Sequence, residues 1–313
     1  MKISSSIFRW LTPVLIIALI AFAIYYPRHV DKQNIWNLFF LVCLYISLGQ
    51  SWNMLSGFAG QTNLGHAAFF GIGALVTRVL WLGKQPFPLA FVAGGLAAVA
   101  FAMIIGVPTF RLRGVYFAIG TLGIAEVMRI TVSQNMPLIS TLPGLMIAHY
   151  DLPSKYYLAL GLAIVTTFAA YLVLRSPWSL GILAVREDEE AAQATGVHIL
   201  RHKLLALALS SLFAGLTGGV FAYQQISYYH YATFSPLWTF DALLIVFIGG
   251  LGTLAGPVIG AIFFIVVREQ LAVNLVSVHQ VIFGVLFILI VLVFPGGLVE
   301  AWERIKKLIF RKE

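Results

Sequence analysis

A run of four acidic residues at 187–190 stands out in an otherwise apolar chain. Acidic side chains stabilise the amino-terminal end of a helix through its dipole. Ala191 and Ala192 follow, and alanine favours helix and is small enough for another surface to approach closely. Gly196 is placed to end such a helix in the left-handed conformation. The pattern from Glu190 to Gly196 therefore predicts a short surface helix with small residues exposed, and the spacing alone also allows a solvated acidic loop.

A second group of polar residues interrupts a glycine-rich region. Gln61, Asn63 and His66 lie between two apolar segments, in or just after the stretch from Gly57 to Gly65. Polar side chains are costly against lipid. The three residues either satisfy one another and the interrupted backbone, or they line the path of a small zwitterionic solute, whose carboxylate and ammonium groups need such partners. Both interpretations remain open from the residues alone.

Charged residues inside apolar segments form a third group. Glu126 and Arg129 stand three residues apart, so that on a helix they can pair on one face. Thr121 lies on the same segment and, with Glu126, is a candidate for the substrate pathway. Asp241, near the start of a short segment, could cap that segment, contact solvent or take part in transport.

The sequence lacks the common signatures of catalysis. It contains no Gly-x-x-x-x-Gly-Lys-Ser/Thr phosphate loop, no His-Glu-x-x-His metal motif and no Gly-x-Ser-x-Gly nucleophile elbow. The single cysteine, Cys43, provides neither a disulfide nor a metal-ligand spacing. We therefore expect no catalytic residue, no metal and no cofactor, and an ATP-driven mechanism would require a separate ATPase.

The elements that position these residues are apolar segments long enough to cross, or nearly cross, a bilayer. Of the 313 residues, 60% are hydrophobic and 10% charged, and the mean hydropathy is +0.92, whereas soluble domains carry about 25% charged residues. The net charge of +8 is scattered through loops without a basic stripe, which argues against nucleic acid as a partner. Ten segments are predicted, at 11–26, 35–56, 67–82, 87–107, 114–133, 156–174, 204–226, 238–250, 254–267 and 280–298.

These segments predict an all-α, polytopic helical membrane protein with about 8–10 transmembrane segments and glycine-rich broken helices. The eighth and ninth segments are short, and they are interpreted as half-helices or as a re-entrant hairpin. If both termini are cytoplasmic, thirteen Lys and Arg lie inside and five outside, as the positive-inside rule requires. Residues 1–313 read as one transmembrane domain, and its longest cytoplasmic loop is 175–203.

Several blocks resemble known permeases. Glu190-Ala191-Ala192-x-x-x-Gly196 resembles the loop by which permeases of ABC importers dock into their ATPase. The blocks 60–74, 114–122, 238–244 and 249–257 resemble the branched-chain amino acid permease family, in the family's order and over roughly residues 40–300. One departure is the stretch 140–145, which lacks the glycine pair usual in that external loop.

The resemblance implies the function and the partners. The chain would be the second-permease type of a branched-chain amino acid importer, a type also related to permeases for urea and short amides. Glu190, Ala191, Ala192 and Gly196 would couple it to ATP hydrolysis. Its partners would be a second homologous permease, two ATP-binding-cassette ATPase subunits, a periplasmic or lipid-anchored solute-binding protein and the lipid of a bacterial inner membrane. The alternatives are an ion-coupled secondary transporter using Glu126 or Asp241, and an intramembrane enzyme.

Overall fold

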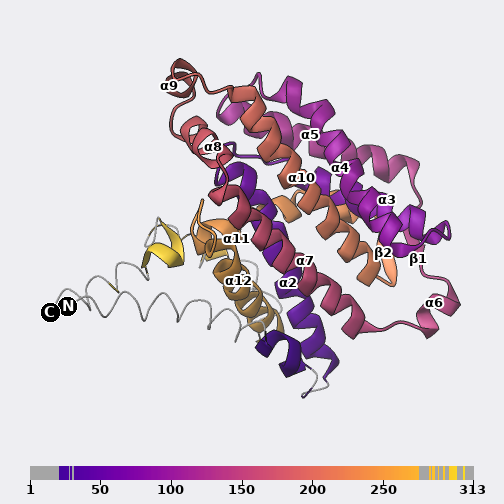
Figure 1. The fold of residues 1–313 in the computed structure, drawn as a ribbon. Coiled ribbons are helices and arrows are strands. Elements are labelled where there is room, and N and C mark those ends of the chain that lie inside the picture. Colours follow the sequence, from indigo (N-terminus) through magenta and orange to yellow (C-terminus); the bar gives the residue numbers. More distant parts are fainter. Residues whose placement is uncertain are drawn as a thin grey trace.

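The protein is an elongated bundle of helices (Figure 1), known from a computed structural model. The structure describes residues 21–27, 29, 32–274, 282, 284, 285, 288, 292, 296–301 and 306. The larger helices of the described part are α2 (Gln33–Ser56), α3 (His66–Leu82), α4 (Phe87–Thr109), α5 (Val115–Asn135), α7 (Leu152–Arg175), α8 (Trp178–Glu187), α10 (Ile199–Gln224), α11 (Leu237–Gly249) and α12 (Gly256–Asn274). The shorter elements are β1 (Ile139–Thr141), α6 (Gly144–Ala148), α9 (Glu189–Ala194), β2 (Ser227–Tyr229) and the 3-10 helix η1 (His230–Phe234).

Five of the described helices, α2, α4, α5, α7 and α10, are long and apolar enough to cross a membrane. The shorter apolar helices α3 and α11 join them. This confirms the predicted all-α, polytopic membrane class. The predicted segments 11–26 and 280–298 lie mostly outside the described residues. The predicted ninth segment is too short, because α12 continues to Asn274.

The packing places α2, α3 and α10 at the centre of the bundle. A Cβ added at Gly218 of α10 would lie 2.0 Å from the carbonyl oxygen of Phe70, and one at Gly73 of α3 would lie 2.1 Å from that of Gly215. Glycine therefore lets the two helices touch backbone to backbone, as is common between membrane helices. By contrast, α5 is mostly exposed. Only 22% of its apolar 18-residue stretch is buried inside the protein, against 72% for the corresponding stretch of α2.

The bundle has two distinct ends, which lie opposite each other in Figure 1. The α9 end carries α8, α9 and the two glycine-rich breaks, 57–65 and 250–255. The β end carries α6, η1 and a two-stranded antiparallel sheet, in which Ile139 pairs with Tyr229. Apolar periodicity did not predict this sheet, whose strands have only three residues each.

At the β end a buried arginine joins three segments of the chain. Arg78 of α3 is fully buried. Its guanidinium donates to the carbonyl oxygens of Ala222, Gln225 and Ile226, which end α10, and to both the carbonyl and the hydroxyl of Ser140. Its charge is thus balanced by backbone dipoles, including those at the negative end of a helix.

Candidate functional site: the α9 surface and the glycine-rich break

The predicted short helix is present as α9, and it ends before Gly196 as expected. Asp188 is its N-cap, and its Oδ1 accepts from the backbone N–H groups of Glu190 (2.8 Å) and Ala191 (3.0 Å). The helix ends before Gly196, whose φ of 87° lies in the left-handed region. The N–H of Val197 then donates to the carbonyl of Ala192 (3.0 Å), which closes the last turn. The acidic stretch is therefore a short capped helix rather than an irregular loop.

The exposure of this helix differs from the sequence prediction at one alanine. Glu190 and Ala191 are exposed, whereas Ala192 is only 4% exposed and faces the protein. A helix of six residues places neighbouring side chains about 100° apart, so the two alanines cannot share one surface. Ala191 belongs to the outer surface of α9, and Ala192 packs beneath it.

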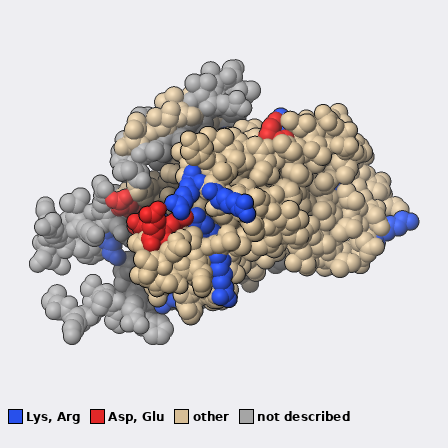
Figure 2. Space-filling view, turned by 90° about the horizontal axis from the view of Figure 1, so that it is seen from above, with Lys and Arg blue, Asp and Glu red and all other residues tan. Residues whose placement is uncertain are grey.

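Acidic side chains gather in one patch at the α9 end of the molecule (Figure 2), with Lys and Arg side chains beside it. The four carboxylates of 187–190 supply acidic groups at this end. Arg113, from the turn before α5, pairs with Glu190 at 3.3 Å, and their side chains are 69% and 82% exposed. Such an exposed pair contributes at most about 1 kcal/mol, which leaves Glu190 free to exchange partners.

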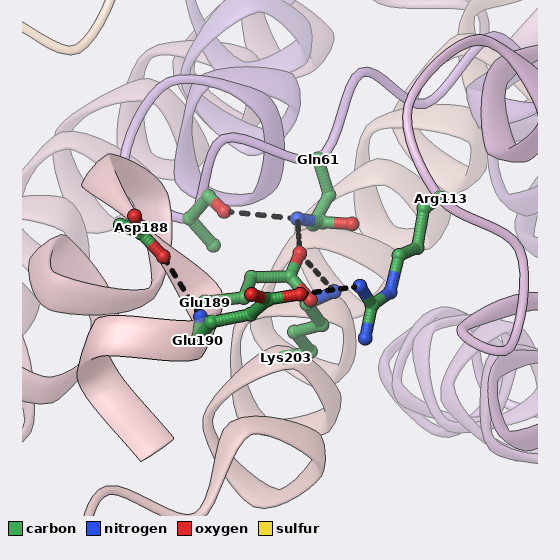
Figure 3. A network of polar contacts seen from close by, with 7 residues as sticks. Gln61, Arg113, Asp188, Glu189, Glu190 and Lys203 are labelled. Atoms are coloured by element: carbon green, nitrogen blue, oxygen red, sulfur yellow. Dashed lines mark hydrogen bonds and ion pairs between the residues drawn. The ribbon is translucent and has the colours of Figure 1, made fainter. Parts of the chain in front are cut away.

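Glu189 makes more deeply placed contacts (Figure 3). Its Oε1 accepts from Nζ of Lys203 at 2.5 Å and from Nε2 of Gln61 at 3.2 Å. Lys203 lies in the first turns of α10 with a side chain only 2% exposed. Gln61 also donates to the carbonyl of Ala59. The structure thus places Gln61, a substrate-pathway candidate from the sequence, against α9.

Asn63 is buried in the break and His66 at the start of α3, and both are largely satisfied by their neighbours. Oδ1 of Asn63 accepts from the N–H of Gly65 (2.8 Å), and Nε2 of His66 lies 2.9 Å from the hydroxyl of Ser51. Trp52 donates to the carbonyl of Asn63. Within the described part of the chain, Asn63 Nδ2 and His66 Nδ1 have no hydrogen-bond partner.

A small cavity lies beside Asn63, between the break and helices α3, α4, α5 and α10. Its walls combine apolar side chains with amide and hydroxyl groups; the lining residues are Asn63, Gly65, Phe69, Ile105, Thr109, Phe117, Thr121 and Leu207. It has room for about one water molecule. Thr121, a substrate-pathway candidate from the sequence, lines this cavity, and its hydroxyl accepts from the N–H of Leu64. A larger ligand would fit only if the surrounding helices moved apart. Of the lining helices that are long enough to cross a membrane, α5 is the least buried.

Glu126 and Asp241, the two acidic candidates within helices, are each paired with an arginine. Glu126 and Arg129 form the predicted i,i+3 pair on α5, with both side chains about two-fifths exposed (38%). Asp241 of α11 pairs with Arg268 of α12 (3.1 Å) and accepts from the hydroxyl of Tyr45 of α2 (2.7 Å). The spacing along the chain gives no signal for this second cluster. Among the described residues, no group of three or more His, Cys, Asp or Glu could hold a metal.

Sequence reasoning missed three residues at the α9 end. Glu189, Arg186 and Lys203 all make contacts with distant segments, and no local pattern in the sequence marks these contacts.

Comparison with known proteins agrees with this architecture. Residues 34–291 match the family described as "Branched-chain amino acid transport system / permease component". The chain is 30% identical to the high-affinity branched-chain amino acid transport system permease protein LivM of Escherichia coli, over 90% of this chain and 74% of that protein. It is 23% identical to the probable permease LivM of Methanocaldococcus jannaschii, over 82% of this chain and 90% of that protein. No solved structure matches it significantly. A match over most of the chain shows that this protein belongs to the family of branched-chain amino acid transport permeases.

Proposed function

We propose that the chain is the membrane-spanning permease subunit of an ATP-binding-cassette importer and that it passes branched-chain amino acids into the cytoplasm. The observation that carries the proposal is α9, a short helix capped at both ends and presenting Glu190 and Ala191 at one end of the bundle. A carrier that works alone has no need of such a docking helix. The name of the Escherichia coli relative supports the same transport system.

The distribution of basic residues supports a cytoplasmic position for the α9 end. Six Lys and Arg of the described loops and helix ends lie there: Arg111, Arg113, Arg175, Arg186, Arg201 and Lys203. Three lie toward the β end: Lys32, Lys84 and Lys155. The positive-inside rule then favours a cytoplasmic α9 end. This orientation agrees with the prediction from the sequence that both termini are cytoplasmic, and we propose a bacterial inner membrane as the location.

The proposed partners are those that the resemblance to permeases of ABC importers implies. Because the sequence has no phosphate-binding loop, ATP must be hydrolysed by separate subunits, and we propose two ATP-binding-cassette subunits that dock on α9. A second homologous permease completes the pathway, and a solute-binding protein delivers the solute at the β end. ATP drives transport only if it binds the two access states with different affinity.

The cavity beside Asn63 supports an aliphatic amino acid as the solute. Phe69, Ile105 and Leu207 offer apolar contact, while Asn63 and Thr121 offer polar groups. Urea has no apolar part that would gain from such walls. We propose that this cavity, widened in the transport cycle, lies on the substrate path.

The structure also weakens the ion-coupled alternative. A carboxylate that carries protons or sodium through a cycle must be able to exchange partners. Glu126 is paired with Arg129, and Asp241 is held by Arg268 and Tyr45.

The test is uptake into proteoliposomes that contain this chain with its second permease and ATPase subunits. We expect ATP-dependent leucine uptake, no uptake of urea, and no uptake by this chain alone. Asn63→Ala should raise the KM for leucine, whereas Thr131→Ala, an exposed position on α5, should not. Leucine uptake by the single chain, driven by an ion gradient, would contradict the proposal. ATP-dependent uptake of urea would support the permease assignment and overturn the substrate.

A further inference from the structure

From the contacts at the α9 end we infer that Arg186 and Glu189 are the positioning residues that make α9 move as one body with both glycine-rich breaks. This inference rests on the proposed function, because it concerns how a displacement of α9 by an ATPase would reach the substrate path. Neither residue belongs to the four predicted to contact the ATPase.

Arg186 provides the first connection. It lies in the last turn of α8, immediately before α9, and its Nη1 donates to the carbonyl of Gly57 at 2.9 Å. A Cβ added at Gly60 would lie 3.1 Å from Cγ of Arg186, and one added at Gly252 would lie 2.4 Å from Nη1. Both glycines have a positive φ, 70° and 74°. The arginine side chain therefore passes between the two breaks, in a space that only glycine leaves open.

The second break is also bound to the end of α2, which leads directly into the first break. Asn53, in the last turn of α2, donates through Nδ2 to the carbonyl of Thr253 (2.9 Å) and accepts through Oδ1 from the N–H of Gly252 (2.9 Å). Gln50, one turn earlier, donates to the carbonyl of Leu254 (2.7 Å). The end of α2 thus binds the 250–255 break, so a force on Arg186 acts on both breaks together.

Glu189 provides the second connection. It is the first residue of α9, and one carboxylate oxygen holds both Lys203 of α10 and Gln61 of the first break. Gln61 lies two residues before Asn63, which lines the cavity. Lys203 is almost fully buried. If the carboxylate moved away, water could not take its place beside the ammonium group. Moving α9 away from the break would lose the Gln61 hydrogen bond, and moving it away from α10 would leave a buried ammonium unpaired.

The neighbouring pair between Arg113 and Glu190 supplies a natural contrast. It joins α9 to another part of the same surface, but both side chains are mostly exposed. Water can solvate each charge when they part, so this pair cannot transmit a displacement. Arg113→Ala is therefore the matched control.

The first experiment measures solute transported per ATP hydrolysed, with the complete importer in proteoliposomes. For Glu189→Ala and Arg186→Ala we expect unchanged ATPase association, continued ATP hydrolysis, and about a tenfold fall in the transport ratio, which corresponds to about 1.4 kcal/mol. Glu189→Lys combined with Lys203→Glu should recover most of the ratio, because the Gln61 amide can accept from lysine as well as donate to glutamate. Arg113→Ala should keep the wild-type ratio.

The second experiment restores the connection covalently. In a Cys43→Ser background, which removes the single native cysteine, Gln61→Cys and Glu189→Cys remove the hydrogen bond, and a short bifunctional thiol reagent then links the two positions. We expect a low transport ratio before linkage and recovery after it. A structural role in folding alone would not produce this recovery.

The outcomes separate the two proposals. If the ATPase subunits do not bind the wild-type chain, the proposed function fails. If they bind and the alanine variants keep a transport ratio within twofold of wild type, only the present inference fails. A further loss of uptake on linkage would also overturn it, because it would mean that α9 and the break must separate during transport.

Discussion

Replacing Arg78 by methionine removes a guanidinium that organises the β end of the molecule. Arg78 is buried. Its guanidinium donates to three backbone carbonyls at and just after the end of α10, and to the carbonyl and hydroxyl oxygens of Ser140. The ring of Tyr228 lies 5.6 Å from its central carbon. Methionine fills a similar length but donates to none of these acceptors, so several buried carbonyl groups would lose their partner.

The magnitude follows from the number and kind of bonds. A hydrogen bond to a charged group contributes about 1.5–3 kcal/mol, and unsatisfied buried acceptors add a penalty. Because bonds to one group are not additive, we expect a loss of about 3–5 kcal/mol, well below the sum over five such bonds. Lysine keeps the charge but has three donors without the planar fork. Arg78→Lys should therefore recover only part of the loss.

The assay is thermal unfolding of the purified protein in detergent. At about 2–4 °C for each kcal/mol, Arg78→Met should lower the midpoint by roughly 10 °C. Arg129→Met, which removes a half-exposed arginine with one partner, should lower it much less. A shift of under about 2 °C for Arg78→Met would refute the reasoning, because it would mean that these contacts do not hold the β end together.

Three further predictions concern glycine and histidine. Gly218→Ala should destabilise the protein by about 1–3 kcal/mol or more, since its Cβ would lie 2.0 Å from a backbone oxygen. Gly161→Ala, at a position with open space around it, should be neutral. Equal thermal unfolding midpoints for the two variants would contradict the close crossing of α3 and α10. Gly196→Val should destabilise the end of α9 by about 1–2 kcal/mol, because the φ of Gly196 is 87°, and it should reduce association with the ATPase. Gly196→Asn should retain that association. Equal association of the two variants would contradict the role of Gly196 as the cap of α9. Burial, together with the charge of Arg78, lowers the pKa of His230, so stability should fall as pH drops below about 6.5, where only the unfolded state binds the proton. His230→Asn should flatten this dependence in thermal unfolding, and an unchanged dependence would contradict it.

The helical part of the fold follows from the sequence because lipid demands it. A span must satisfy its own backbone, so long apolar runs bounded by polar residues have one structural solution. The predicted 35–56 and 114–133 correspond to α2 and α5 within two residues at each end. The prediction for α12 stopped at 267 because Arg268 looks like the end of an apolar run. In the structure, the guanidinium of Arg268 pairs with Asp241 and donates to the hydroxyl of Tyr45. The helix therefore continues past Arg268.

The candidate site was predictable where the signal is local. The caps of α9 depend on residues within one turn, and Asp188 and Gly196 behave as their types predict. Which face of α9 packs inward depends on α8 and α10, so alanine spacing could not show that Ala192 is buried. The partner of Gln61 lies 128 residues away, and no pattern along the chain marks such a contact.

The most direct test of the central claim measures how tightly the ATPase subunit binds to this chain in detergent or nanodiscs. Ala191 is exposed on α9, and Ala191→Trp places a bulky ring on the proposed contact surface without entering the protein core. Leu145→Trp, at a position 80% exposed on α6 at the opposite end of the bundle, is the control. We predict at least about a tenfold loss of affinity and a parallel loss of uptake for Ala191→Trp, with both unchanged for Leu145→Trp. Wild-type affinity and uptake in the Ala191→Trp protein would contradict the assignment of α9 as the docking helix.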